Sequence, residues 1–73
     1  MNTKQFFIAK HFEHVEGHAR SMIYVDHNAY IVHEVHEGEM YIIEYCVDLK
    51  RTWVGVAFDH MHAIDLIETH RNL

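Results

Sequence analysis

The segment Glu39–Phe58 constrains the fold most, because it holds two apolar stretches separated by a short turn. The stretches Met40–Val47 and Thr52–Phe58 are rich in the β-branched and aromatic residues that favour strands. A turn around Asp48–Arg51 separates them. We therefore expect a hairpin here, with the rest of the chain organised around it.

Two more strands are predicted before this hairpin, over Met22–Asp26 and Ala29–His36. Each is followed by residues that favour a tight turn. His27–Asn28 contains an asparagine, which tolerates positive φ, and Glu37–Gly38 contains a glycine, which adopts it freely. The four strands predict an antiparallel meander.

Tight turns would fix the register of the sheet, with Asp26 opposite Ala29, His36 opposite Glu39 and Val47 opposite Thr52. One face then carries no charged side chain: Ile23, Val25, Tyr30, Val32, Tyr41, Ile43, Tyr45, Val54, Val56 and Phe58. The opposite face is mixed but largely apolar: Met22, Tyr24, Ile31, His33, Val35, Met40, Ile42, Glu44, Cys46, Trp53, Gly55 and Ala57.

The segment Asp59–His70 is predicted to be a helix that covers the uncharged face. Asp59 suits the N-cap position. The helix has an apolar stripe and a polar face, made respectively of Ala63, Ile64, Leu66 and Ile67 and of Asp65, Glu68 and Arg71. The expected fold is α+β, in a single domain over residues 1–73: an antiparallel meander of four or five strands with the C-terminal helix packed on one face.

Residues 2–19 fit either a helix or a strand, which leaves the number of strands open. Apolar residues recur at helical spacing after a possible cap at Asn2 or Thr3: Ile8, Phe12, Val15 and Ala19. The consecutive Phe6, Phe7 and Ile8, together with Gly17, favour a strand with a turn at Glu16–Gly17. We expect the strand.

Charge and composition narrow the partners. The chain has 11 acidic and 6 basic residues, and its formal charge of -5 disfavours a nucleic-acid backbone as the main partner. We expect a cytoplasmic protein without a membrane segment, because the chain has no signal segment and no apolar run near the ~18 residues that span a bilayer. The single cysteine, Cys46, forms no intrachain disulfide and is expected to be a small buried hydrophobe.

The mixed face of the sheet has no obvious cover, and an apolar face left open on a monomer is a liability. A protein partner or a second copy of the chain would cover it. The side chains expected to form this binding surface are Tyr24, Met40, Ile42 and Trp53. This pattern favours a small non-catalytic binding protein, with no catalytic residues and no cofactor.

Histidine chemistry supports an alternative. The chain contains nine histidines, so its charge changes between neutral and mildly acid pH. The densest polar cluster lies where the last strand meets the helix and contains Asp59, His60, His62 and Asp65. Asp59, His60 and His62 are the candidate ligands for zinc or another divalent metal. His11, His14 and His18 would share a face only if residues 2–19 were helical.

Short motifs resemble those of small uncharacterised proteins encoded by phages and prophages. The similar elements are Phe12-Glu13-His14 with Gly17, His36-Glu37-Gly38 with Tyr41, and Trp53-Val54-Gly55 followed by Phe58-Asp59 and His62. The last element resembles a Trp-x-Gly-Phe-Asp-x-x-His segment, although Val56-Ala57 is inserted. The resemblance implies a mobile-element setting. The small size, the acidity and the uncovered apolar face favour an accessory factor that docks on or inhibits a host protein. A structural homodimer is a further alternative.

Overall fold

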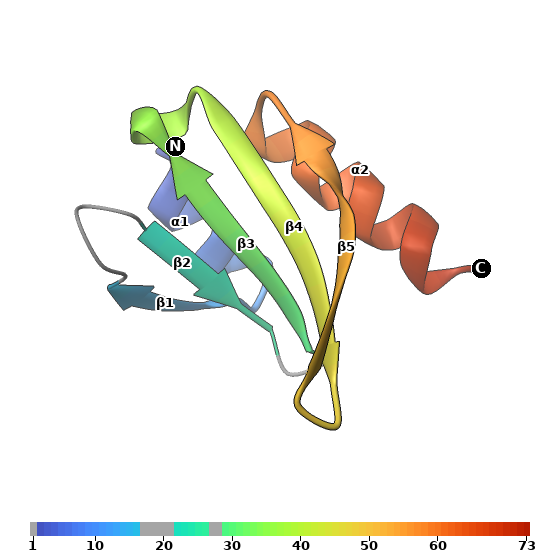
Figure 1. Cartoon of the computed structure of the whole chain (residues 1–73). Helices are drawn as coiled ribbons and strands as arrows, with labels where there is room; N and C mark the ends of the chain where they lie inside the picture. The colour runs from blue at the N-terminus through green and yellow to red at the C-terminus, as the bar shows by residue number, and fades with distance from the viewer. Residues whose placement is uncertain (1, 17–21, 27–28) are drawn as a thin grey trace.

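The fold is a five-stranded antiparallel meander with two helices, as seen in a computed structural model that describes residues 2–16, 22–26 and 29–73 (Figure 1). The sheet order follows the chain, β1-β2-β3-β4-β5. The elements are α1 (Thr3–Ala9), β1 (Glu13–Glu16), β2 (Met22–Val25), β3 (Tyr30–Val35), a short 3₁₀ turn (His36–Gly38), β4 (Met40–Val47), β5 (Lys50–Ala57) and α2 (His60–Arg71). The predicted α+β class and the C-terminal helix on the sheet are confirmed.

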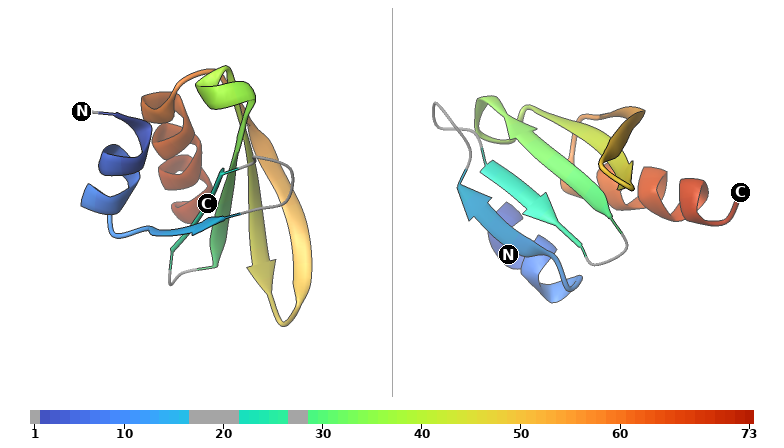
Figure 2. Two further views of the ribbon diagram at one scale, coloured as in Figure 1. Left: turned by 90° about the vertical axis from the view of Figure 1, so that its left-hand side faces the viewer. Right: turned by 60° about the horizontal axis from the view of Figure 1, so that its bottom comes forward.

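Both helices lie on the same face of the sheet, which the edge-on view shows directly (Figure 2). From α1, Phe7 stacks on Tyr24 of β2 with ring centroids 4.5 Å apart. From α2, Ala63, Ile64 and Ile67 are buried, as the apolar stripe predicted. Gly55 of β5 lets α2 approach closely, because a Cβ there would lie 3.2 Å from Leu66 Cδ1.

The strand expected at the N-terminus is wrong for Thr3–Ala9, which is a helix. Asn2 and Gln5 form a reciprocal capping box, and this local signal outweighs the strand preference of the consecutive phenylalanines. A strand follows at Glu13–Glu16, so the segment contains both elements. The predicted turn partner Gly17, with His18 and Ala19, lies outside the described residues, and so does the predicted turn His27–Asn28.

The predicted register holds between β3 and β4, where Val35 pairs with Met40. Between β2 and β3 it is wrong by one residue. The Asp26 amide donates to the Tyr30 carbonyl, and Ala29 has a φ of 75°. The chain therefore turns back one residue later than a two-residue turn would, and Tyr24 pairs with Val32.

This shift exchanges the faces of β2. Tyr24 is 1% exposed in the core, whereas Ile23 and Val25 lie on the other face and are half-buried. The expectation that Tyr24 belongs to the binding surface is therefore wrong. A one-residue slip moves every side chain of a strand to the opposite face, so one turn decides the assignment.

The β4–β5 hairpin also differs from the prediction. Asp48 and Leu49 both have positive φ, 53° and 64°, so Val47 pairs with Lys50 instead of Thr52. An irregularity at Ile43/Glu44 then shifts the register again. Trp53 keeps its predicted face, opposite Glu44.

Beyond that irregularity the predicted faces of β5 are exchanged. Ala57 is in the core opposite Tyr41, and Val56 faces away from it opposite Ile42. Phe58, which the prediction placed in the core, is 68% exposed. Neither helix of the described part of the chain is long and apolar enough to cross a membrane.

Candidate functional site

The face of the sheet opposite the helices, here called the open face, is a broad surface on which no described segment packs. Side chains from all five strands contribute to it, in rows set by the cross-strand register. One row contains Glu13, Val25, Ile31, Glu44 and Trp53, and the next contains Val15, Ile23, His33, Ile42 and Val56. Val35 pairs with Met40 beyond the second row, and Cys46 pairs with Arg51 beyond the first.

The open face is mainly apolar. Trp53 is 66% exposed and Val15 is 45% exposed, while the aliphatic side chains between them are half-buried. Of the four residues predicted to form the binding surface, three lie here: Met40, Ile42 and Trp53. The sequence reasoning missed Ile23, Val25 and Val56, because turn geometry rather than composition places them on this face.

A small polar cluster interrupts the apolar surface. His33 Nε2 lies 2.6 Å from Glu44 Oε1, and Arg51 Nη1 lies 3.7 Å from the same oxygen. The His33 and Glu44 side chains are only about a quarter exposed, at 24% and 23%. The cluster is therefore paired within one chain before anything covers the face.

The acidic and histidine cluster at the start of α2 has structural contacts. Asp59 is the N-cap, as predicted, and its Oδ1 accepts a hydrogen bond of 2.7 Å from the His62 amide. The His60 ring packs on Phe6 of α1 with centroids 4.3 Å apart. Within residues 2–16, 22–26 and 29–73 no three histidine, cysteine or carboxylate side chains are grouped so that they could hold a metal ion.

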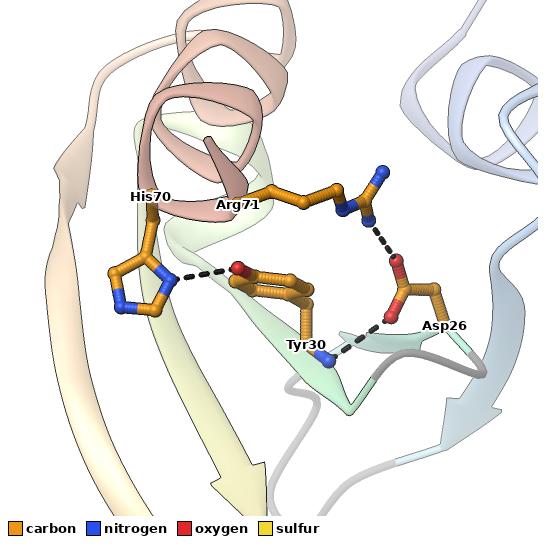
Figure 3. A network of polar contacts seen from close by, with 4 residues as sticks. All are labelled: Asp26, Tyr30, His70 and Arg71. Carbon is orange, nitrogen blue, oxygen red and sulfur yellow. Dashed lines mark hydrogen bonds and ion pairs between the residues drawn. The ribbon is translucent and has the colours of Figure 1, made fainter. Parts of the chain in front are cut away.

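The far end of α2 is tied to the β2–β3 turn by a network of four residues (Figure 3). Arg71 Nη2 donates to Asp26 Oδ2 at 2.8 Å, and the Tyr30 amide donates to Asp26 Oδ1 at 3.0 Å. The Tyr30 hydroxyl and His70 Nδ1 are joined by a hydrogen bond of 2.7 Å. Asp26 is 9% exposed, so these donors take the place of the water that an exposed carboxylate would bind.

This network borders a groove of about 440 Å³ between the C-terminal ends of the two helices. Its floor is apolar, formed by Phe12, Ile64 and Ile67, and its rim carries Lys10 and Glu68. Because Asp26 and Arg71 pair with each other in its wall, the groove presents no unsatisfied charge from that pair. We assign these residues a structural role, in joining the helix to the sheet.

Three tyrosines of the helix-covered face are held in their neutral form. Burial, with a hydrogen bond of 2.9 Å to Glu34 Oε1, raises the pKa of Tyr24 far above its usual range. Burial also raises the pKa of Tyr30 and of Tyr41. These hydroxyls act as structural hydrogen-bonding groups in the core rather than as ionising groups.

Comparison of the chain with protein-family models, with curated proteins and with solved structures gives no match.

Proposed function

We propose that this chain is a small non-catalytic interaction protein that binds another protein through its open face. The observation that carries the proposal is that α1 and α2 cover the same face of the sheet. Their placement leaves an apolar surface with an exposed tryptophan at one edge. Monomeric proteins rarely expose a contiguous apolar surface of this kind unless something binds it.

The composition of the open face suits a protein partner. Tryptophan is enriched among the residues that contribute most to protein–protein affinity. Trp53 is exposed at the β5 edge of the open face, opposite Glu44 and next to the half-buried aliphatic side chains Ile42 and Val56 of the second row. The polar cluster of His33, Glu44 and Arg51 is already paired, which lowers the cost of burying it.

The proposal also extends to the biological setting in which the protein acts. The resemblance to phage and prophage proteins favours a mobile-element accessory factor that works in the cytoplasm, and the short motifs quoted above are its sole support.

Site-specific photo-crosslinking in living cells tests the proposal. A benzoylphenylalanine is placed at Trp53 on the open face or, as the control, at Met61 on α2, which is 65% exposed and so closely matches the 66% of Trp53. We expect one dominant protein adduct from position 53 and none from position 61. Equal adducts from both positions, or none above background from position 53, would contradict the proposal.

A further inference from the structure

We propose that the protein covering the open face is a second copy of this chain, stacked face to face about a two-fold axis that runs along β3. This inference rests on the proposed function and names its partner. Two-fold dimers are the commonest symmetric assemblies, and they require a surface that is complementary to itself. The open face meets this requirement in its apolar pattern, its charges and its size.

The apolar pattern is self-complementary because the axis exchanges the two edges of the sheet. In the row that crosses all five strands, Glu13 lies at the β1 edge, Ile31 at the centre and Trp53 at the β5 edge. Rotation about β3 places Trp53 of each copy over Glu13 at the β1 edge of the other, beside Val25 and Val15. In the second row the same rotation stacks Val56 on Val15 and Ile42 on Ile23. Ile31 meets its own copy near the axis.

The charges select this axis over one that runs across the strands. Glu13 is exposed at the β1 edge, while Arg51, whose side chain is 61% exposed, lies at the β5 edge on the same face. Exchange of the edges brings Glu13 of each copy towards Arg51 of the other, at two equivalent places. An axis across the strands would instead stack β1 on β1 and β5 on β5, with like charges on the same edge.

The polar side chains at the centre of the open face are already paired, which favours their burial in a dimer. Burial of a charged side chain costs free energy unless an oppositely charged, hydrogen-bonded side chain is buried with it. His33 and Glu44, on the central strands β3 and β4, already supply each other with a hydrogen bond of 2.6 Å. Face-to-face stacking therefore buries no unpaired charge near the axis.

The size of the face also favours a copy of itself. Five strands spaced ~4.8 Å apart, of up to eight residues rising ~3.3 Å each, span only roughly 500 Å² in projection. Specific interfaces bury about 600 Å² or more of accessible surface on each partner. The whole corrugated face has to be covered to reach that range, and a second sheet of the same dimensions and twist does so in an aligned sandwich.

Sedimentation equilibrium of the purified chain, at protein concentrations chosen between about 1 and 500 µM, tests the inference. We expect a monomer–dimer equilibrium in the micromolar range. Trp53→Ser should raise the dissociation constant by at least about tenfold, as for a large aromatic side chain that the partner covers. The matched control Met61→Ser, on α2, should leave it within about twofold, since exposed residues outside an interface contribute little. Far-UV circular dichroism checks that each variant is folded.

Charge reversal tests the axis. Glu13→Arg and Arg51→Glu should each weaken the dimer by roughly three- to tenfold, because each replaces an exposed ion pair by a pair of like charges and the pair occurs twice. The double variant should recover most of the loss. Reversals without effect, or without recovery in the double variant, would overturn the stacking proposed here.

A chain that stays monomeric at every concentration would overturn the self-association, and so would a dimer that Trp53→Ser leaves intact. Neither result decides the proposed function, which the cross-linking at positions 53 and 61 tests separately. An adduct with a different protein at position 53, from a chain that is monomeric when purified, would retain the interaction function and discard the second copy.

Discussion

His33 and Glu44 lie side by side on the central strands of the open face, with His33 Nε2 2.6 Å from Glu44 Oε1. They belong to neighbouring rows of the β3–β4 register, in which His33 pairs with Ile42 and Ile31 pairs with Glu44. The contact is therefore a diagonal one between two strands, and apolar side chains surround it. It gives the open face a polar centre that is satisfied within one chain.

This diagonal contact should be measurable in the free chain. We expect a double-mutant cycle of His33→Ala and Glu44→Ala to give a coupling energy of about 0.5–1.5 kcal/mol, as for a typical intramolecular hydrogen bond. Urea unfolding at low micromolar protein concentration measures it. Glu39→Ala, at an exposed position, combined with His33→Ala is the control cycle. Coupling no larger than in that control would contradict the assignment.

The pair of Asp26 and Arg71 should stabilise the fold. Asp26→Asn removes the charge that accepts from Arg71, and we expect it to lower the free energy of unfolding by about 1–3 kcal/mol. Arg71→Leu should lower the free energy of unfolding by less than Asp26→Ala does. In Arg71→Leu the Asp26 carboxylate keeps the hydrogen bond from the Tyr30 amide, whereas Asp26→Ala removes both hydrogen bonds. Thermal and urea unfolding report both changes. Glu68→Gln, exposed on the same helix turn, should be close to neutral; an equal loss there would refute the special role of the pair.

The buried tyrosines predict a loss of stability at alkaline pH. Burial raises the pKa of Tyr24, Tyr30 and Tyr41, so the folded chain keeps protons that an unfolded chain releases above about pH 10. Their contribution is complete below that pH and declines as the pH rises past it. Urea unfolding at pH values chosen between about 9 and 11.5 measures the decline in the free energy of unfolding. Phenolate absorbance should rise together with unfolding. Free titration of all four tyrosines in the folded protein would contradict this prediction.

Asp59 should act as a helix cap. We expect Asp59→Ala to destabilise the fold by about 1 kcal/mol, because it removes the acceptor for the His62 amide. His62→Ala should change stability little, since the bond uses the backbone amide and not the imidazole. Thermal unfolding with and without added zinc distinguishes the helix-cap role of Asp59 from the alternative that Asp59, His60 and His62 bind a metal. A zinc-dependent rise in melting temperature that Asp59→Ala and His62→Ala both abolish would favour the metal-site hypothesis.

The sequence predicts the strands, the C-terminal helix and the Asp59 cap well, because each depends on local residue preferences. The apolar period of β4, the glycine at position 38 with its φ of 96° and the stripe Ala63, Ile64 and Ile67 are all local signals. The register between β3 and β4 follows from the turn that contains Gly38, and it is correct.

The sequence does not predict the positions that depend on turn length or on a bulge. Ala29 adopts positive φ although it is not a glycine, and this lengthens the β2–β3 turn by one residue. Tyr24 moves into the core as a result, while the stretch around Val54 shifts the register of β5 and turns Val56 to the open face. The N-terminal helix was a second difficulty, because three consecutive apolar residues obscure the capping box of Asn2 and Gln5.

The fluorescence of Trp53, the only tryptophan in the chain, tests most directly whether the open face is a docking surface that a second copy covers. Acrylamide quenching is measured across the concentration range in which the dimer forms. We predict a readily quenched, red-emitting Trp53 in the dilute monomer, consistent with its 66% exposure, and protection with a blue shift as the chain associates. A Trp53 that remains equally accessible to acrylamide while the chain dimerises, or that is shielded in the dilute monomer, would contradict the account.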